Sequence, residues 1–362
     1  MDEIPVKFSI PAYHKALIDW FDRSFRELPW RDTRNPYHIW ISEIMLQQTQ
    51  VTTVVPYYQR FISVFPTVYD LVKADLSQVL KQWEGLGYYA RARNLHKAAK
   101  QIVEQFNGTL PDTEQVLRTL TGIGPYSSAA ILSIAFDKQL AVVDGNVSRV
   151  LCRLFRIDQD PKSATGKKTL QNLATQLLAT DRPGDYNQAI MELGALVCRP
   201  KSPRCNECPV QAYCSAYQMN ETEKFPVKSP ARERPHHHIA AGIIYRGDEI
   251  LIAKRPESGL LGGLWEFPGG KVEPGETREQ TVAREIREEL GINVRVLDHI
   301  ASIDHAYTHF SITLHVYACE YISGEPRAIG CADWKWVTGE TINEHAFPRA
   351  NRKILDMLIK QT

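Results

Sequence analysis

The chain lacks the features of a secreted or membrane protein. It has seven cysteines in 362 residues, a low and odd number that does not fit a disulfide scaffold. It contains no apolar run of about 18 residues, which excludes a transmembrane helix. Asp2, Glu3 and Lys7 interrupt the first residues, so we expect no secretory signal. These absences predict a cytoplasmic protein without a membrane partner.

The chain also lacks an excess of charge. Its 43 basic and 42 acidic residues leave a net charge of +1, which argues against a strongly basic coat protein but not against a local basic face. Residues 1–225 hold 26 basic and 23 acidic residues (+3), and residues 226–362 hold 17 and 19 (−2), which sum to +1. The small excess favours the first part as the binder of a polyanion.

The sequence divides into a helical part and an α+β part. Residues 1–219 carry apolar residues at helical spacing, and we expect helices over 13–25 and 37–51. Residues 220–238 are polar, with three prolines, and are typical of a linker. Residues 239–362 predict an α+β domain, with four strands and one helix, expected at 239–245, 249–254, 294–303, 311–320 and 277–290.

Four cysteines stand close together as C-x6-C-x2-C-x5-C. They are Cys198, Cys205, Cys208 and Cys214. Four thiolates can hold an iron–sulfur cluster, and zinc accepts the same donors. The residues alone therefore predict a metal centre and leave its metal open.

A glycine-rich turn precedes an isolated aspartate. Gly122 and Gly124 allow a sharp turn and leave amide groups exposed at the start of the next helix, where a phosphate can bind. Asp144 follows an apolar stretch and precedes Gly145. From the residue alone, a helix N-cap is the better interpretation of Asp144, with a reacting carboxylate as the alternative.

Glu43 stands among apolar residues in the expected helix 37–51. Ile41, Ile44 and Met45 surround it in sequence. Burial among such residues would raise the pKa of its carboxyl and let it act as a general acid. An exposed glutamate on a polar helix face is an equally good interpretation of this segment.

Three glutamates share a helix face in the α+β part. The fixed positions from Gly270 to Ile292 match the Nudix box, and Glu285, Glu288 and Glu289 lie at i, i+3 and i+4 within it. Like charges at this spacing repel unless a cation binds. We therefore expect Mg²⁺ or Mn²⁺ here.

Taken together, these motifs resemble those of a known family. The hairpin, Asp144 and the cysteine loop 198–214 resemble the endonuclease III superfamily of DNA glycosylases. The strings LPWR (28–31), SEIMLQQTQV (42–51), WEGLGYYARARNLHKAA (83–99), GPY (124–126) and VDGNV (143–147) are similar to its adenine-specific MutY branch.

The resemblance implies the fold and the cofactor. The fold is a mostly α helix-hairpin-helix glycosylase domain with a 4Fe–4S loop at 198–214, followed by an α+β Nudix-like domain that recognises 8-oxoguanine. The activity that it implies is monofunctional removal of adenine from A:8-oxoguanine or A:G mispairs in double-stranded DNA. Nothing in the sequence indicates more than a monomer.

The resemblance also assigns roles to residues. Glu43 is the general acid, Asp144 stabilises the oxocarbenium-like sugar, and Tyr126 and Asn146 hydrogen-bond to these carboxylates and to the attacking water. Gly122 and Gly124 hold the DNA backbone. The residues expected to line the adenine pocket are Trp30, Arg31, Leu46, Val51 and Gln188. Those expected to recognise the mispair or 8-oxoguanine are Gln48, Thr49, Leu86, Tyr88, Tyr307, Thr308 and His309.

Three other functions remain open from the sequence. The Nudix box would suit a nucleotide pyrophosphohydrolase. A glycosylase with lyase activity would need a lysine where Tyr126 stands, because tyrosine cannot form a Schiff base. The third is a DNA-binding or redox-sensing module without catalytic activity, in which a cluster on the cysteine loop reports on DNA charge.

Overall fold

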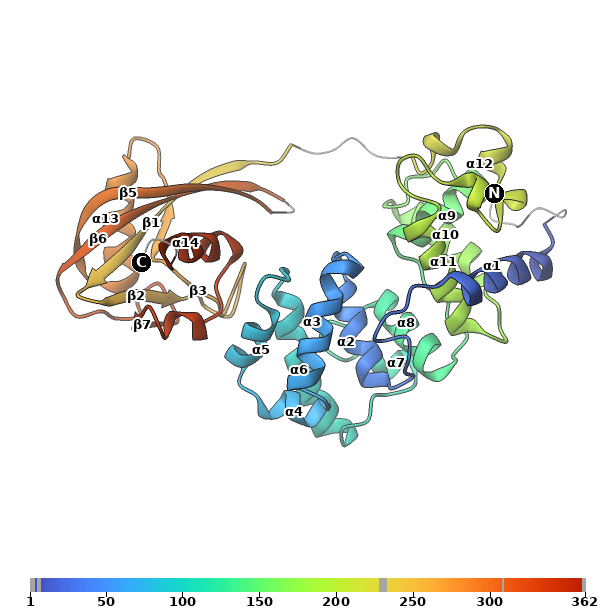
Figure 1. Ribbon diagram of the computed structural model, residues 1–362, viewed down its shortest axis with the longest axis horizontal. Helices are drawn as coiled ribbons and strands as arrows, with labels where there is room; N and C mark the ends of the chain where they lie inside the picture. Colours follow the sequence, from blue (N-terminus) through green and yellow to red (C-terminus); the bar gives the residue numbers. More distant parts are fainter. Residues whose placement is uncertain (1–3, 5–7, 228–232, 308, 360–362) are drawn as a thin grey trace. The chain divides into compact units, whose positions relative to one another are not determined.

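The chain folds as two compact units, each with its own core. The structure is a computed structural model that describes residues 4, 8–227, 233–307 and 309–359 (Figure 1). The first unit comprises Met1–Tyr69 and Lys97–Ala231, and the second comprises Asp70–His96 and Arg232–Thr362. The second unit therefore takes a short internal segment of the chain as well as the C-terminal part.

The first unit is helical, as expected. Most of its helices are short, and α4 and α6 each begin in one unit and end in the other. The helices are α1 (Ile10–Ser24), α2 (Pro36–Leu46), α3 (Val51–Val64), α4 (Val68–Lys73), α6 (Ala90–Phe106), α7 (Glu114–Leu117), α8 (Pro125–Phe136), α9 (Gly145–Phe155), α10 (Ala164–Gln176), α11 (Pro183–Leu196) and α12 (Ser215–Gln218), with the 3-10 turns η1 (Cys205–Glu207), η2 (Gln211–Tyr213) and η3 (Thr222–Lys224).

Helix α8 lies at the centre of this unit. Its sequence is apolar on every side, and its residues from Ser127 to Ser133 are buried, as expected for a helix surrounded by others. It packs against α2, α7 and α11, while α9 packs against α10, α11 and α12. This arrangement brings the N-terminal ends of α8 and α9 near the middle of α2, where Glu43 lies.

The prediction of one helix over 37–51 is wrong for its last third. Helix α2 ends at Leu46 and a separate helix, α3, begins at Val51. Gln48 between them has φ 58°, in the left-handed region that a continuing helix cannot use. The break directs Gln48 and Thr49 into a turn rather than along a helix face.

The second unit is built on one mixed sheet. Its strand order is β3-β2-β1-β6-β5, with β4 pairing with β1 and β7 with β2, and only β1 and β6 run parallel among the described pairs. The strands are β1 (His236–Arg246), β2 (Glu249–Lys254), β3 (Trp265–Glu266), β4 (Gly269–Lys271), β5 (Asn293–Ala306), β6 (Ser311–Ser323) and β7 (Asp333–Thr338).

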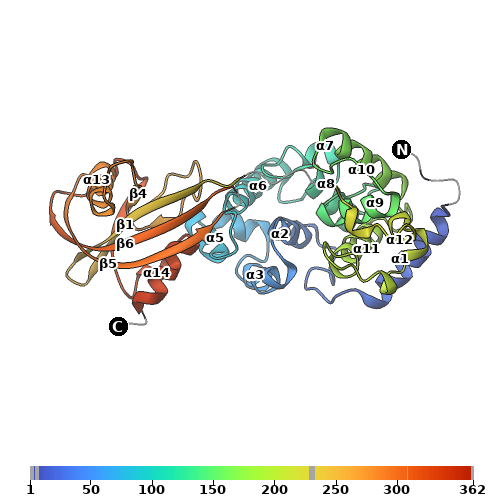
Figure 2. The same cartoon turned by 90° about the horizontal axis from the view of Figure 1, so that it is seen from above.

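A helix covers each face of this sheet (Figure 2). Helix α13 (Arg278–Leu290) covers one face, where Ala240 and Ile244 point. Helix α14 (Arg349–Ile359) covers the other, where Ala241 and Ile243 point. Because successive strand residues point to opposite faces, the all-apolar run of β1 is explained by cores on both sides. The second unit also contains η4 (Ile342–Glu344).

The internal segment of the second unit includes α5 (Leu76–Trp83). Asp75 begins this helix with a capping box in which Gln78 bonds back to the Asp75 amide. Leu80 of α5 packs toward Gly263, where an added Cβ would lie 3.1 Å from the Leu80 Cδ1 atom. Residues 70–96 thus have packing partners among the C-terminal residues.

The predicted linker is partly structured. Residues 222–224 form η3, residues 228–232 lie outside the described part, and β1 begins at His236. The three histidines 236–238 are therefore strand residues, and the His238 Nδ1 atom lies 3.2 Å from the His315 Nε2 atom of β6. Across the described residues, no helix has both the length and the apolar character needed to cross a membrane.

Candidate active site

The turn between α7 and α8 exposes backbone groups. Gly122 has φ 82°, which only glycine adopts readily. Gly124 is the N-cap of α8 and Pro125 its first residue, so the first amide groups of α8 have no partners within the helix. A Cβ added at Gly124 would meet no heavy atom of the described residues within 4 Å. The turn therefore has space for a phosphate in front of it.

Asp144 is both a helix cap and a site residue. It is the N-cap of α9 and accepts a 2.7 Å hydrogen bond from the Val147 amide. Asn146 Nδ2 donates a second bond of 3.0 Å to its other oxygen. Burial nevertheless raises the pKa of Asp144, against the lowering effect of these bonds. The two interpretations of Asp144 are compatible, because the cap orients the carboxylate.

Glu43 is buried, as one of its two interpretations predicted. It is 5% exposed on α2. Burial raises its pKa to about 7, although a 3.1 Å hydrogen bond from the Tyr126 hydroxyl lowers it and the nearby Asp144 charge raises it further. A carboxyl with this pKa is protonated in a large fraction of molecules at neutral pH.

Tyr126 completes this arrangement. Its hydroxyl also lies 3.3 Å from the Met191 Sδ atom. Burial raises the pKa of Tyr126 well above its usual value, so the phenol stays neutral and acts as a donor. The carboxyl of Glu43 is therefore held by a neutral partner instead of a cation.

The two carboxyls line one enclosed cavity. Its volume is about 150 Å³, roughly ten times what one water molecule needs on the same measure. All five residues expected to line the adenine pocket are in its wall, together with both carboxyl residues, Tyr126 and Asn146. The five are Trp30, Arg31, Leu46, Val51 and Gln188.

A wider groove adjoins this cavity. It shares Leu46, Thr49, Tyr126 and Asp144 with the cavity, and its volume is about 1080 Å³. Gln48, Gly122 and Gly124 also line it. The expected phosphate turn, two expected mispair residues and the two reacting groups thus meet in one continuous depression of the first unit.

Leu86 and Tyr88 belong to the second unit and differ in exposure. Leu86 is 5% exposed, whereas Tyr88 is 43% exposed. The Arg91 guanidinium lies 5.3 Å from the centre of the Tyr88 ring. Of the two expected probing residues, only Tyr88 presents its side chain at the surface of its unit.

The four cysteines gather in the loop after α11. Their thiols are close enough to interact electrostatically, because Cys198, Cys205 and Cys214 each raise the pKa of Cys208, after burial. Arg153, which is 1% exposed, lies 3.3 Å from the Cys198 Sγ atom. Among the described residues, no three His, Cys, Asp or Glu side chains are placed to hold a single metal ion. The donor set, four thiols and no other ligand type, suits a multi-iron cluster with one thiolate per iron.

Arg149 connects the cysteine loop to Asn146. Its Nε donates 2.8 Å to the Cys198 carbonyl, and one of its terminal nitrogens donates 2.9 Å to the Asn146 Oδ1 atom. Asn146 in turn donates to Asp144. Side-chain contacts therefore run without interruption from the cysteine loop to the cavity.

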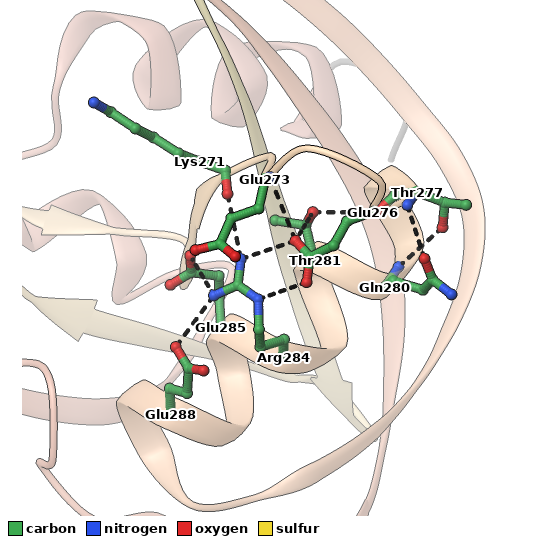
Figure 3. Close-up of polar contacts among 9 residues, drawn as sticks. All are labelled: Lys271, Glu273, Glu276, Thr277, Gln280, Thr281, Arg284, Glu285 and Glu288. Carbon is green, nitrogen blue, oxygen red and sulfur yellow. Dashed lines mark hydrogen bonds and ion pairs between the residues drawn. The ribbon is translucent and has the colours of Figure 1, made fainter.

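The Nudix-box glutamates have a protein counterion (Figure 3). Arg284 donates to both oxygens of Glu276, at 2.7 and 3.0 Å, and to Glu285 at 3.0 Å and Glu288 at 3.2 Å. Glu289 instead lies among Glu266, Glu285 and Arg255, and burial raises its pKa to about 8. Of the three predicted ligands, Glu285 and Glu288 thus have Arg284 as a counterion and Glu289 does not.

The expected recognition loop lies at the end of β5. Tyr307 stacks on Phe310 with ring centres 4.8 Å apart, and its amide donates 2.8 Å to the Phe310 carbonyl. His309 is exposed, and Thr308 lies outside the described residues. Tyr307 is thus held between β5 and β6 by its neighbours.

Comparisons with known proteins agree with both units. Residues 41–176 match the HhH-GPD superfamily of base excision DNA repair proteins, and residues 240–357 match the NUDIX domain. The adenine DNA glycosylases of Rattus norvegicus and Homo sapiens are each 36% identical to this chain, with 95% of it covered and 77% and 73% of theirs. The chain belongs to the adenine DNA glycosylase family.

Solved structures of other proteins share the fold of the helical unit of this adenine DNA glycosylase family member. A thermostable thymine-DNA glycosylase is 29% identical with a TM-score of 0.54, over 58% of this chain and 97% of that one. Endonuclease III in a trapped covalent DNA intermediate shares the fold at 22% identity and a TM-score of 0.50, over 59% and 99%. The predicted fold class, a helical HhH-GPD part followed by a Nudix-like α+β part, is confirmed.

The sequence did not predict one charge network in the cavity wall of this adenine DNA glycosylase family member. Glu192 on α11 is 1% exposed and accepts paired hydrogen bonds from Arg26 and Arg31, of 2.6–3.2 Å. Burial alone would raise its pKa, but the two guanidinium groups outweigh burial and lower the pKa to about 2. No local pattern marks this network, because its partners stand more than 160 residues apart.

Proposed function

We propose that this base excision repair enzyme removes adenine mispaired with 8-oxoguanine or guanine from duplex DNA, as a monofunctional N-glycosylase. In this proposal residues 1–219 act as the glycosylase domain and residues 239–362 as the recognition domain. The observation that carries the proposal is a pair of carboxyls, Glu43 and Asp144, in the wall of one cavity. Their hydrogen-bond donors differ: a tyrosine hydroxyl for Glu43 and a backbone amide for Asp144. Since adenine in a duplex is stacked, it must leave the helix to enter such a cavity.

Glu43 supplies the proton. A purine leaves more easily after protonation at N7, because it departs as a neutral base. The pKa of Glu43, raised to about 7 by burial, keeps a proton available near neutral pH. As the bond between N9 and C1′ breaks, both electrons go to the base, and the proton from Glu43 goes to N7.

Asp144 stabilises the sugar. The departing base leaves positive charge on the ring oxygen and C1′, much as in glycoside hydrolysis. Bonds from the Val147 amide and Asn146 keep the Asp144 carboxylate in place. Water then adds to C1′, and Glu43, now ionised, can take the proton that this water loses. The product is an abasic site.

The same cavity disfavours lyase chemistry. Tyr126 stands where a Schiff-base lysine would be required, and its phenol is occupied in the bond to Glu43. No lysine lines the described cavity. We therefore expect strand breakage only after separate treatment of the abasic site.

Recognition of the opposite base is assigned to two regions. Gln48 and Thr49 line the groove of the first unit. Tyr88, Tyr307 and His309 belong to the second unit, and Thr308 is assigned from the sequence alone. The aromatic rings of Tyr88 and Tyr307 suit insertion between bases.

We infer that Cys198, Cys205, Cys208 and Cys214 hold a 4Fe–4S cluster. When bound, such a cluster holds the loop 198–214 in one shape and can exchange an electron. The excision step described above passes through the carboxyls alone. Iron and sulfide content of the purified protein, with its visible absorbance, distinguishes this cluster from zinc.

The proposed activity can be tested on matched duplexes. Duplexes with adenine opposite 8-oxoguanine, guanine or thymine are incubated with excess enzyme and divided into samples with and without alkali. We expect breaks at adenine only after alkali, fastest opposite 8-oxoguanine and absent opposite thymine. Absence of an alkali-labile break opposite 8-oxoguanine would refute the proposal, and a break without alkali would restore the lyase alternative.

A further inference from the structure

The segment after α5 has an unusual backbone. Gly85 and Gly87 have φ values of 93° and 78°, and Tyr88 has φ 49°. A tyrosine in the left-handed region is energetically costly and needs support from its surroundings. The segment 84–89, which we call the Tyr88 loop, must therefore be held in place by specific contacts.

Some of these contacts come from the loop's own neighbours. The Trp83 Nε1 group donates 3.1 Å to the Gly87 carbonyl, and Arg91 donates 3.0 Å to the same oxygen. The Gly85 amide donates 3.0 Å to the Tyr89 hydroxyl. These bonds fix the inner side of the Tyr88 loop.

The remaining contacts come from the C-terminal part of the same unit. The Phe347 amide donates 2.9 Å to Glu84 Oε1, and the Tyr89 hydroxyl lies 3.4 Å from the Phe347 carbonyl. Lys81 donates 2.6 Å to Glu84 Oε2 and 3.1 Å to the His345 carbonyl. Glu84 and Tyr89 thus hold both polar groups of one backbone residue.

Phe347 is itself held in place by the core of the second unit. Its side chain is 0% exposed in the core between the sheet and α14. The preceding residue, Ala346, accepts a 2.9 Å bond from the Trp265 amide of β3. Arg93, just beyond the Tyr88 loop, adds a 2.8 Å bond to the Gly262 carbonyl. A loop tied to this segment is therefore tied to the core of the Nudix-like part.

We infer that Glu84 and Tyr89 are positioning residues through which the Nudix-like part holds the Tyr88 loop in its mispair-probing shape. This inference rests on the proposed function, in which Tyr88 probes the mispair. The base opposite adenine would then be recognised in two ways. The Nudix-like part contacts it directly, and it also sets the position of a ring contributed by residues 84–89.

The inference predicts a defect in discrimination and not in chemistry. Glu84→Ala removes the acceptor of the Phe347 amide and the partner of Lys81, so the strained loop can relax. The probe is a duplex with a non-cleavable 2′-fluoro adenine opposite 8-oxoguanine or guanine. We expect the ratio of the two Kd values, which measures the preference for 8-oxoguanine, to fall roughly tenfold, the size of one or two lost hydrogen bonds. The single-turnover rate at saturating enzyme should stay within about twofold of the wild-type rate.

Three further variants of the full chain make the test specific. Glu84→Gln keeps an oxygen acceptor for the Phe347 amide and should recover most of the preference. Tyr89→Phe removes only the hydroxyl and should lower the preference, while hydrogen exchange of residues 84–91 should increase. Glu104→Ala removes an exposed glutamate of α6 and should change nothing.

The outcomes separate the two proposals. A wild-type enzyme that leaves adenine opposite 8-oxoguanine intact would refute the proposed function. An active wild type that binds both duplexes equally would overturn the positioning role alone, because there would be no preference for the loop to support. A selective wild type whose Kd ratio survives both Glu84→Ala and Tyr89→Phe would overturn the positioning role alone. Variants that bind both duplexes equally more weakly, and that differ otherwise only in a lower Tm, would also overturn the positioning role, because this result indicates a merely structural role.

Discussion

Two groups of carboxyls, one in each unit, show how the same residue type is put to different uses. In the Nudix-like part, Arg284 pairs with Glu276, Glu285 and Glu288, and its hydrogen bonds lower the pKa of Glu276 to about 2. In the cavity of the helical part, Glu43 is buried beside a phenol, with a pKa of about 7. The difference lies in the nearest partner, because a cation keeps a carboxylate charged whereas a neutral donor in a buried site lets it hold a proton.

The comparison also applies within the helical part. Glu43 and Glu192 line the same cavity, but the pKa of Glu192 falls to about 2 because two arginines outweigh its burial. We expect Glu192 to fix the cavity wall and Glu43 to react. The substitutions below test this division of roles.

The largest expected effect is on the rate of excision. Glu43→Gln removes the proton donor while keeping the shape of the buried group, so the single-turnover rate on A:8-oxoguanine should fall about 10²–10⁴-fold. DNA binding should remain. Glu27→Gln, at an exposed glutamate of the first unit, is the matched control, and equal rates in the two variants would contradict the role of Glu43.

The next effect is on stability. Glu192→Ala leaves Arg26 and Arg31 without their counterion, which should cost about 3 kcal/mol, at the lower end for a broken buried pair because Arg26 is partly exposed. The pKa of Glu192 is lowered, so its contribution is full above its ordinary value of 4.5 and is lost as the pH falls through about 2. Urea unfolding of both proteins at pH 7 and near pH 2 measures this, and a constant difference would argue against the pairing.

A smaller effect is expected on the pH dependence of excision. Glu43 must be protonated to donate, so the single-turnover rate should fall as the pH rises above about 7 and approach a tenfold loss per pH unit. DNA binding, measured in parallel, should not follow this curve. A rate that is constant to pH 9 would show that another group supplies the proton.

The pKa of Glu289, in the second unit, predicts how the stability of the protein depends on pH. Burial raises its pKa to about 8, with help from Glu266 and Glu285, so its charged form destabilises the fold. The stability gained below pH 4.5 is lost as the pH rises through about 8. Glu289→Gln should therefore stabilise the protein at pH 9, on the order of 1 kcal/mol, and have little effect at pH 4, below both pKa values. Thermal unfolding at the two pH values decides this.

The smallest effect is expected for the Nudix box. Arg284→Met should lower Tm by about 2–4 °C, because partly exposed ion pairs contribute little. Because Arg284 already supplies a counter-charge to three of the box glutamates, we expect that Mg²⁺ does not raise the Tm of the wild type and that 8-oxo-dGTP is not hydrolysed. Turnover of 8-oxo-dGTP that Glu288→Gln abolishes would show instead that the box binds a metal and acts as a pyrophosphohydrolase.

The sequence predicted features that depend on neighbouring residues. The N-terminal cap and the end of α13, strand β2, the glycine turn and the cysteine spacing are all encoded within short windows. Helix α14 and the short strands β3, β4 and β7 were not predicted. Strands β3 and β4 have only two and three residues, too few to show a period, and they form by pairing with β2 and β1.

The residues predicted for the active site lie together in one cavity, but the prediction missed a partner that packing provides. Resemblance to a family brought Trp30, Glu43, Asp144 and Gln188 together, although periodicity alone could not. It gave no partner for Arg31, because the bond to Glu192 depends on how α11 packs in the folded unit. The sequence pattern also did not show that Arg284 points toward Glu276, Glu285 and Glu288.

The order of the chain has a consequence for biosynthesis. The second unit needs residues 70–96, which leave the ribosome early, and residues 232–359, which leave it last. Until the final strand and helix emerge, Glu84 and Tyr89 have no Phe347 backbone to bind. The nascent chain can therefore complete the cavity around Glu43 well before it can fix the Tyr88 loop. A truncated product that ends in the linker would keep the reacting groups and lose the support of the residues that we expect to choose the mispair.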